Sequence, residues 1–396
     1  MKKSSVFLDT EHKSHFPLDM ALITLLWEEY SVSLFGSLDK IEEMKQGMDD
    51  NGIPPEAVTF LEKRDPFACR NNWDKLQNLL IARKNVKTLR RAIQESPSPL
   101  HIITSFSNNF YTLSLLPALR KFPSVAFVHN LRDWVNIQGE EDPEKKNRVF
   151  LNQKVLKRLD AVFFIEDYLK KNAERWIKKP SFVFPYRVTS HEELEFRRKA
   201  LRRKNIPTFV ISGTVSKRSR DYSLVFSALS SVRKPFSLVL LGHASERDVV
   251  ELGKRTLGEK LVSFESYLSE REYKEHLFQA HFLIGCVKDG VYGEWQGTGI
   301  EFDGPAFGIP TLIPANAIPE NQNGLFLRYD SESALRSLCQ KGIAAIEAGT
   351  YEKDFLSPAM KKAECFYQEK WKQMLLSQIP KIKGFSKPTL NSKNGG

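Results

Sequence analysis

The stretch 290–315, which reads GVYGEWQGTGIEFDGPAFGIPTLIPA, combines residue types that suit a phosphate-bearing ligand. An apolar run at 281–287 precedes it and is typical of a buried strand, and a Gly-Ile-Pro turn leads into a second apolar strand. Between them lie a glycine-rich loop and a short helix with Glu301 and Asp303. Backbone N–H groups at a helix start bind phosphate, glycine permits close approach, and a carboxylate inside the helix accepts hydrogen bonds from ribose hydroxyls. The pattern predicts a nucleotide site.

A second candidate for phosphate binding is the segment 212–229, SGTVSKRSRDYSLVFSAL. Gly213 closes an apolar strand, and Lys217, Arg218 and Arg220 follow before the next helical pattern. Cations beside a helix N-terminus suit a diphosphate, because fixed positive charge and N–H donors meet there. An exposed basic turn is the alternative interpretation.

These motifs need a scaffold, and the apolar periodicity predicts one. Strand-like runs rich in Val, Ile and Phe alternate with longer helical patterns, at 6–10, 31–37, 101–106, 124–130, 161–166, 181–186, 208–213, 237–242, 261–266, 281–287, 311–315 and 324–329. This spacing indicates βαβ units and parallel sheets. We expect an α/β fold of two Rossmann-like, doubly wound domains that face a cleft, with ligands beyond the carboxyl ends of the strands.

The domain organisation follows from where the alternation stops and restarts. We expect an N-terminal acceptor domain over 1–187, a linker or hinge over 188–205, and a C-terminal donor domain over 206–358. The helical pattern at 359–380 is expected to pack back on either domain. The polar, basic tail at 381–396 is expected to be disordered.

Composition narrows the function classes further. The chain of 396 residues has a formal charge of +11 at pH 7 and no apolar run near the ~20 residues of a membrane span. We expect a cytoplasmic protein, with the inner face of the membrane as an option, because its basic runs attract phosphates, anionic lipid or nucleic acid. Each run also fits a solvated helix face. The four cysteines lack the spacing of a metal site, and no P-loop, HExxH, GxSxG or first-strand GxGxxG motif occurs.

In the first half, polar residues after strands are candidates for the acceptor side. His129 ends an apolar strand and is suited to bond sugar hydroxyls or a developing charge, although a hydrogen-bonded loop histidine is equally compatible. His15 follows the first strand. Asn108 or Asn109 is suited to donate to an acceptor hydroxyl.

The second half resembles the nucleotide-binding half of group 1 glycosyltransferases, which are retaining enzymes of GT-B architecture. The shared pattern covers about 206–330: a strand with Gly213 and a basic loop, then D-x-x-L-x-x-A-L, a strand ending in LG, a glycine loop and a G-x-P turn. The resemblance implies that Asp303 takes the place of the acid that holds the donor ribose. It also implies that His129 contacts the donor sugar, and that no bound metal is needed.

Two departures from the family pattern concern the acidic residues. Counting back from Asp303 by the usual family spacing reaches Trp295 rather than a glutamate, so the neighbouring Glu294 is the catalytic candidate. Asp also replaces the usual glutamate at position 303. Glu301 fits a solvated helix position, and the backbone of Gly297, Thr298 and Gly299 is the better candidate for a pyrophosphate cradle.

The sequence therefore predicts a glycosyltransferase that moves a sugar from a nucleotide diphosphate sugar to a hydroxyl acceptor, without a cofactor. The sugar, the base and the acceptor stay open. Two alternatives remain: a GT-B-fold sugar-nucleotide epimerase, and a non-catalytic or nucleic-acid-binding protein of the same fold. Nucleic acid is the less favoured partner, although the charge is compatible with it.

Overall fold

The computed structural model describes residues 4–10, 15–105, 108–135, 143–202, 206–288, 292–318 and 326–385. The chain divides into two compact units. The first comprises 1–185 and 371–396, and the second comprises 186–370. The chain thus passes from one unit to the other twice. None of the helices in the described ranges is both long and apolar enough to span a membrane.

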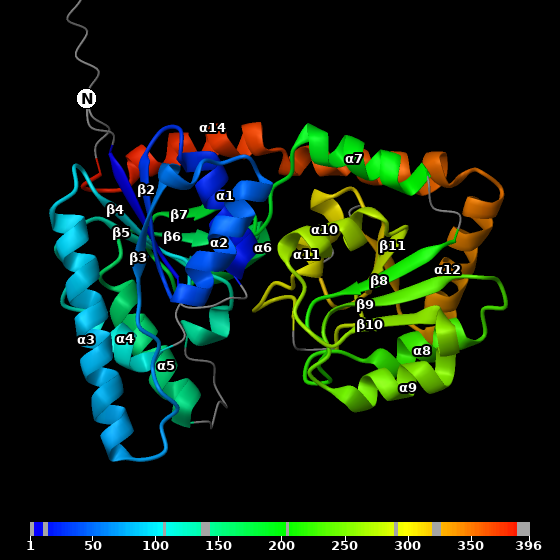
Figure 1. The fold of residues 1–396 in the computed structure, drawn as a ribbon, viewed down its shortest axis with the longest axis horizontal. Coiled ribbons are helices and arrows are strands. Elements are labelled where there is room, and N and C mark those ends of the chain that lie inside the picture. Colours follow the sequence, from blue (N-terminus) through cyan, green and yellow to red (C-terminus); the bar gives the residue numbers. More distant parts are fainter. Residues whose placement is uncertain are drawn as a thin grey trace, which may run out of the picture. The chain divides into compact units, whose positions relative to one another are not determined.

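The first unit is built on a seven-stranded parallel sheet in the order β3-β2-β1-β4-β5-β6-β7 (Figure 1). Its strands are β1 (Ser5–Asp9), β2 (Ser31–Gly36), β3 (Val58–Glu62), β4 (Leu100–Ile103), β5 (Ser124–Val128), β6 (Ala161–Phe164) and β7 (Ser181–Val183). All residues of β1, β4, β5 and β6 are buried, as expected for a sheet covered on both faces. Their near-continuous apolar composition follows from that burial.

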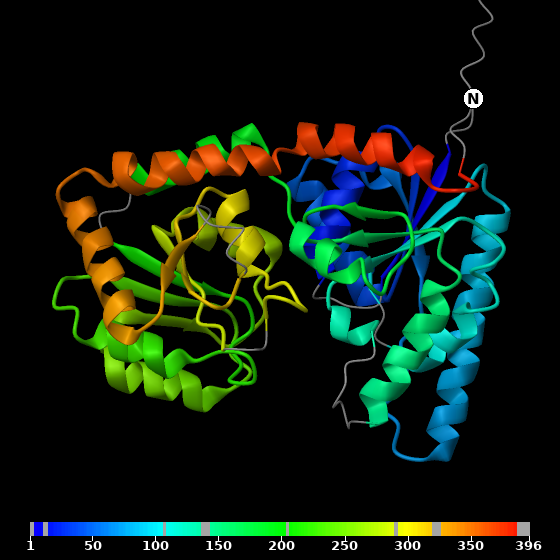
Figure 2. The same ribbon diagram turned by 180° about the vertical axis from the view of Figure 1, so that it is seen from behind.

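Helices connect these strands and cover the sheet. They are α1 (Phe16–Leu26), α2 (Leu38–Asp50), η2 (Pro55–Ala57), α3 (Asn72–Gln94), α4 (Asn109–Leu115), η3 (Leu131–Asp133), α5 (Pro143–Leu156) and α6 (Asp167–Ala173). The two views show α1 and α2 on one face of the sheet and α4 and α5 on the other (Figures 1 and 2). Helix α3 packs beside α4, and a capping box of Asn71 and Asp74 fixes its start.

The second unit has a six-stranded parallel sheet in the order β10-β9-β8-β11-β12-β13. Its strands are β8 (Thr208–Ser212), β9 (Ser237–His243), β10 (Leu261–Phe264), β11 (Phe282–Ile284), β12 (Thr311–Pro314) and β13 (Leu327–Tyr329). One hydrophobic cluster lies on each face. The larger cluster includes Phe226 and Phe282, and the smaller includes Leu277 and Phe307. The sheet is therefore covered on both sides by helices.

The helices of the second unit include the segment that we expected to be a linker. They are α7 (His191–Arg202), α8 (Tyr222–Ser230), α9 (Arg247–Leu257), η4 (Gly258–Lys260), α10 (Glu270–Phe278), α11 (Ile300–Ala306), α12 (Glu332–Glu347), η6 (Glu352–Leu356), α13 (Ser357–Ala363) and η7 (Glu364–Phe366). Helix α14 (Gln368–Gln378) begins at the end of the second unit, and from Trp371 on it belongs to the first. Most of 188–205 is thus helix α7, whose Arg197 and Leu201 are buried within the second unit. A hinge at this position stays a prediction.

The C-terminal region also differs from its expected form. The pattern at 359–380 is not one helix but α13, η7, α14 and the short helix η8 (Ile379–Lys381). Of the tail expected to be disordered, 381–385 is packed, because Ile382 and Phe385 are buried and the Phe385 ring lies 6.0 Å from that of Tyr30. Residues 386–396 lie outside the described residues.

The strand order reverses once in each sheet, and these reversals locate the sites. In the first sheet the chain moves outward in one direction from β1 and in the other from β4. In the second sheet the same happens at β8 and β11. Loops that follow such neighbouring strands diverge and leave a crevice at the carboxyl edge, where ligands of open α/β sheets bind.

Candidate functional site

The predicted phosphate loops follow β8 and β11, the two strands at the reversal of the second sheet. The backbone N–H of Asp221 donates to the Cys286 carbonyl at 2.7 Å, and that of Lys288 donates to the Ser219 carbonyl at 2.9 Å. An isolated antiparallel bridge joins Arg220 to Val287. The structure therefore brings together two segments that are far apart in the sequence, as a site made of both requires.

Gly213 is the point where the first loop leaves β8. Its φ is +91°, and a Cβ there would lie 2.6 Å from Nη2 of Arg220. A Cβ on Gly242, at the end of β9, would lie 2.5 Å from the Gly213 carbonyl oxygen. Only glycine fits either position without displacement of the backbone or of Arg220.

The three predicted cations are not equivalent. The Arg220 guanidinium is held by the Gly213 carbonyl at 3.3 Å and by the Tyr222 hydroxyl at 3.5 Å. Burial lowers the pKa of Arg220, but Tyr222 and Cys286 outweigh it, so the pKa is raised and the charge persists. Lys217 instead pairs with Asp248 and with Glu246. Its charge is thus offset within the protein.

Arg218 is exposed, and among the described residues its side chain forms no ion pair. The carboxylate of Asp221 caps α8 by accepting from the N–H groups of Ser223 at 3.1 Å and Leu224 at 3.3 Å. These donors are therefore already used. Arg218 and Arg220 remain the cations best placed to meet an anion.

The glycine loop after β11 leads directly into α11. Gly299 is the N-cap of α11, and a Cβ there would meet no atom within 4 Å. Thr298 is buried, and its N–H donates to Glu301 at 3.2 Å. Glu301 is therefore not a solvated helix residue but a buried one. Glu294 is exposed on the same loop.

Asp303 is buried and ion-paired, which the sequence did not indicate. Its Oδ1 lies 2.9 Å from Nε of Arg187, and its Oδ2 accepts from the Tyr273 hydroxyl at 2.7 Å. Arg187 also bonds Glu270 at 2.5 Å. Burial lowers the pKa of Arg187, but the charges of Glu270 and Asp303 outweigh this effect, so the pKa is raised. Burial and Asp303 also raise the pKa of Tyr273. Asp303 is thus held in one orientation.

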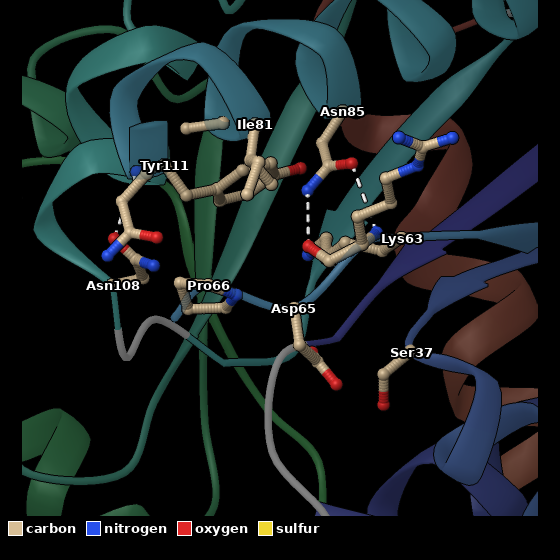
Figure 3. Close-up of a pocket in the computed structure, with 11 residues that line it drawn as sticks. Ser37, Lys63, Asp65, Pro66, Ile81, Asn85, Asn108 and Tyr111 are labelled. Carbon is tan, nitrogen blue, oxygen red and sulfur yellow. Dashed lines mark hydrogen bonds between the residues drawn. The ribbon is translucent and has the colours of Figure 1, made fainter. Parts of the chain in front are cut away.

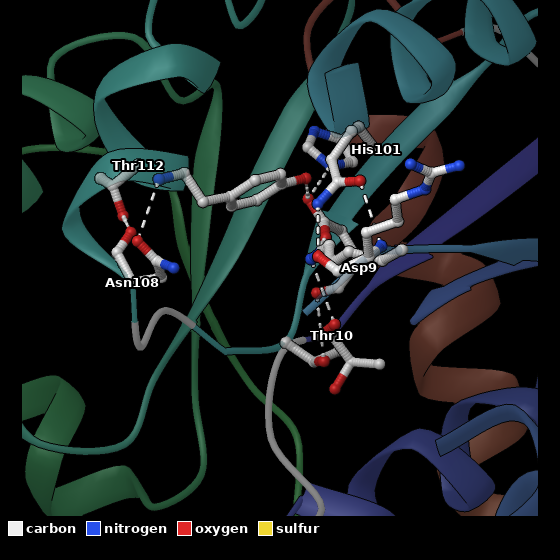
Figure 4. Close-up of polar contacts among 10 residues, drawn as sticks. Asp9, Thr10, His101, Asn108 and Thr112 are labelled. Carbon is white, nitrogen blue, oxygen red and sulfur yellow. Dashed lines mark hydrogen bonds and ion pairs between the residues drawn. The ribbon is translucent and has the colours of Figure 1, made fainter. Parts of the chain in front are cut away.

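In the first unit, a buried polar cluster lies at the carboxyl edge between β1 and β4. Asp9 pairs with Lys63 at 2.7 Å, contacts His101 Nε2 at 3.1 Å and accepts from the Tyr111 hydroxyl at 2.7 Å. Lys63 also donates to the Thr10 carbonyl at 3.2 Å. Figure 4 shows Asp9, Thr10 and His101 of this cluster. Burial alone would raise the pKa of Asp9, but Lys63 and His101 lower it to about 2.

A small cavity of about 40 Å³ adjoins this cluster. Figure 3 shows residues from three strand ends around it, with Asn108 and Tyr111 on one side and Ser37 on the other. Helix α3 forms a further wall through Asn78, Ile81, Ala82 and Asn85. Asn85 holds the wall in place by bonding the backbone N–H and carbonyl of Arg64, at 3.1 and 2.9 Å.

The structure brings two predicted histidines together. The rings of His15 and His129 lie 4.2 Å apart. Nε2 of His129 lies 2.8 Å from the Thr104 carbonyl, which can only accept, so this nitrogen carries a proton. Burial, only partly opposed by Thr104 and Asp19, lowers the pKa of His129. The ring is thus neutral near pH 7, with its hydrogen on Nε2.

The two predicted asparagines have different environments. The Asn108 side chain caps α4, accepting from the N–H of Phe110 at 2.8 Å and of Tyr111 at 3.3 Å, and also lines the cavity. Asn109 is exposed. Only Asn108 is therefore adjacent to the buried cluster.

Comparison with known proteins finds solved structures of the same fold. No protein-family model matches the chain, and no curated protein matches it. Sucrose-phosphate synthase from Thermosynechococcus elongatus matches with a TM-score of 0.67 at 13% identity, over 96% of this chain and 99% of that one. Anabaena HepE in complex with UDP and glucose matches with a TM-score of 0.62 at 13% identity, over 96% and 100%. The chain has the GT-B fold.

The same fold also includes enzymes of another reaction class. The UDP-GlcNAc 2-epimerase from Neisseria meningitidis, bound to UDP-GlcNAc, matches with a TM-score of 0.57 at 13% identity, over 95% of this chain and 100% of that one. At such identities the likeness establishes the architecture of the two units. What the protein does must be argued from its own residues.

We expect the lowered pKa of Asp9 to make the folded state less stable at acidic pH. A carboxyl whose folded pKa is about 2 rather than 3.8 contributes about 2 kcal/mol at neutral pH, which is lost as pH falls from about 4 through about 2. Urea unfolding of wild type and Asp9→Asn should therefore give free energies that converge by that amount between about pH 5 and pH 2.

The exposed Asp49→Asn substitution is the control, and it should leave the pH profile unchanged. At neutral pH, Asp9→Asn should cost about 3–5 kcal/mol, because Lys63 loses its buried counter-charge. The double variant Asp9→Asn/Lys63→Met should recover part of this loss. A constant difference between wild type and Asp9→Asn at all pH values would contradict the assignment.

Proposed function

We propose that the protein is a glycosyltransferase that moves a sugar from a nucleoside diphosphate sugar to a hydroxyl acceptor. The observation that carries the proposal is the meeting of the β8 and β11 loops at the reversal of the second sheet, with Arg220 held between Gly213 and Tyr222. The GT-B fold supports it, because HepE of the same fold was solved with UDP and glucose.

The largest electrostatic demand of this reaction is the charge that builds on the leaving diphosphate. Arg220 and Arg218 would offset it, with Lys217 in a lesser role because of its internal partners. Of the predicted backbone cradle at 297–299, the N–H groups of Gly297 and Gly299 would be further donors, because that of Thr298 already donates to Glu301. Fixed donors of this kind stabilise developing charge strongly, since they need no reorganisation during the reaction. Glu294 would lie near the donor sugar.

Asp303 would hold the donor ribose. A carboxylate has about four acceptor positions, and Arg187 and Tyr273 use one on each oxygen. The remaining positions suit the ribose hydroxyls. Arg187 and Tyr273 are then positioning residues for Asp303.

The first unit would supply the acceptor side. Neutral His129, held through its Nε2 hydrogen by the Thr104 carbonyl, would contact a sugar hydroxyl. His15 beside it, and Asn108 with Asn109 after β4, would orient the acceptor. Retention of configuration and independence from a bound metal belong to the proposal through the group 1 resemblance.

Epimerisation of a sugar nucleotide is the second candidate, because UDP-GlcNAc 2-epimerases share this fold. The two reactions leave different products. A glycosyltransferase releases a nucleoside diphosphate in an acceptor-dependent manner, whereas an epimerase converts one nucleotide sugar into another.

Product analysis tests the proposed function directly. The protein is incubated with each common nucleoside diphosphate sugar and a mixture of acceptors, and the nucleotides are separated by chromatography. We expect one nucleoside diphosphate to accumulate only when acceptors are present. Accumulation of an epimer without acceptor, or binding of no nucleotide sugar, would overturn the proposal.

We expect Arg220→Ala to weaken binding of nucleoside diphosphates about 10- to 100-fold, the loss typical of one charge-assisted hydrogen bond. Isothermal titration calorimetry measures it, and Arg220→Lys should recover part of the affinity. Lys234→Ala is the matched control: it removes an exposed cation of the same unit whose partner is Glu347, at 3.1 Å. Equal losses in Arg220→Ala and Lys234→Ala would indicate a general charge effect only.

Asp303→Asn should reduce nucleotide affinity at least about tenfold, because the uncharged amide is a weaker acceptor for ribose hydroxyls. Glu270→Gln is its matched control, since Glu270 binds the same Arg187. Nucleotide affinity and unfolding midpoint are measured for both variants. If both lose affinity equally, Asp303 acts only through the Arg187 ion pairs.

A further inference from the structure

Helix α3 (Asn72–Gln94) exposes large apolar side chains along its first turns. Trp73, Leu76 and Leu80 are 64%, 46% and 48% exposed, and their spacing places them on one face. Single exposed apolar residues are ordinary, but three gathered on one helix face form a patch that marks an interaction surface. We name these three residues the apolar patch.

The outward face of α3 continues as a row of cations. Arg83, Lys84, Lys87 and Arg91 are exposed and follow the apolar patch at helical spacing, and no acidic residue occurs between positions 75 and 94. Arg91 pairs with Glu95, whereas within the described ranges no carboxylate pairs with the other three. The opposite face, with Val86, Leu89 and Ile93, is buried in the first unit.

The occupant that fits this face is an anionic phospholipid bilayer. A tryptophan and leucines on a convex helix insert into the headgroup boundary, and flanking Lys and Arg attract lipid phosphates. A nucleic acid would use the cations but leave the apolar patch in water. A protein partner would need a groove that matches a convex ridge, whereas a bilayer deforms around it.

The inward side of the same helix lines the cavity beside Asp9 and Lys63. Asn78, Ile81, Ala82 and Asn85 form this wall. A helix with its side chains is about 10 Å across, so the apolar patch and the cavity lie about one helix diameter apart. Figure 1 shows the first turns of α3 projecting beyond the sheet, past the strand ends where the cavity lies.

We propose that the outward face of α3 docks the protein on an anionic bilayer, so that the cavity of the first unit meets an acceptor carried in that membrane. The identification of the membrane-held molecule as the acceptor rests on the proposed function, whereas the docking itself does not depend on it. The hydroxyl-bearing headgroup of a membrane-held amphiphile would reach the cavity without leaving the lipid surface.

A second basic surface of the first unit provides an internal comparison. At the amino edge of the sheet a groove of about 770 Å³ is lined by seven cations, Arg120, Lys121, Lys154, Lys157, Arg158, Lys179 and Lys383. Arg158 donates to the Lys154 carbonyl in the last turn of α5 at 2.8 Å, and Lys179 donates to the Leu159 carbonyl, just beyond that helix, at 2.7 Å. The apolar residues of the groove, Leu119 and Phe122 among them, are buried. This groove attracts anions, but its apolar side chains are buried and cannot insert into a bilayer.

The test is flotation of the full-length protein with vesicles of phosphatidylcholine alone or with about 30 mol% phosphatidylglycerol, at about 0.1 and 0.5 M salt. Wild type should bind the anionic vesicles. Trp73→Ser/Leu76→Ser/Leu80→Ser should bind at least about tenfold more weakly at both salt concentrations. Arg83→Gln/Lys84→Gln/Lys87→Gln should lose binding mainly at low salt, by roughly fivefold per charge at most.

The matched control is Arg120→Ser/Lys121→Ser/Lys157→Ser, which removes three exposed cations from the groove and should reduce binding less than about threefold. Insertion is read separately, by quenching of tryptophan fluorescence with brominated phosphatidylcholine. Wild type should be quenched, whereas Trp73→Phe should bind but lose most of the quenching. Circular dichroism and thermal unfolding show that each variant is folded.

The inference is overturned if the α3 variants bind vesicles like wild type, or if the groove variant alone loses binding. It is also overturned if wild type ignores vesicles and instead binds duplex DNA, or forms a dimer that the Ser variant dissolves. Nucleoside diphosphate binding is measured on the same variants and should be unchanged. Loss of vesicle binding and loss of nucleotide binding therefore report separately on this inference and on the proposed function.

Discussion

Parallel pairing places the carboxyl ends of all strands of a sheet at one edge, and a reversal of strand order leaves a crevice there. In the second unit this reversal lies between β8 and β11, so the backbone after one strand meets the backbone after the other. The contact depends on positions without side chains, because a Cβ at Gly213 or Gly242 would collide with Arg220 or with the backbone. In the proposed function Arg220 faces a diphosphate, and that position depends on these two loops staying this close.

The same edges hold most of the buried charge, and burial explains its pairing. An ionised side chain removed from water costs several kcal/mol unless a partner and further hydrogen bonds offset the loss. Asp9 has Lys63, His101 and Tyr111, and Asp303 has Arg187 and Tyr273. These partners fix the orientation of each carboxylate, and that preorganisation is what a site needs to bind hydroxyls without moving.

Features that depend on neighbouring residues could be predicted from the sequence, whereas features that depend on residues far apart in the chain could not. The sequence pattern over 72–94 is that of a helix, and helix α3 has the same bounds in the structure. Strand β3 was missed because prolines precede it and one face is only half buried, and with it Lys63 was missed. Arg187 pairs with Asp303 across most of the second unit, and no local pattern encodes such a partner. From the sequence, Tyr273 and Tyr111 are equally compatible with ordinary core residues. Only the structure shows that each hydroxyl donates to a carboxylate.

The positive charge of the chain has more than one physical origin, and the difference matters for function. At the amino edge of the first sheet, cations gather beyond the C-terminal end of α5, where positive charge compensates the helix dipole, and the adjoining apolar side chains are buried. Arg158 donates to the Lys154 carbonyl in the last turn of α5, and Lys179 donates to the Leu159 carbonyl just beyond it. On α3 the cations lie beyond the first turns, on a face that also exposes Trp73 and two leucines. Helix-dipole compensation accounts for Arg91 in the last turn but not for Arg83, Lys84 and Lys87. Since exposed apolar surface is unfavourable in water, its coincidence with this unpaired charge fits an anionic partner that also accepts apolar groups, and a lipid bilayer has both properties.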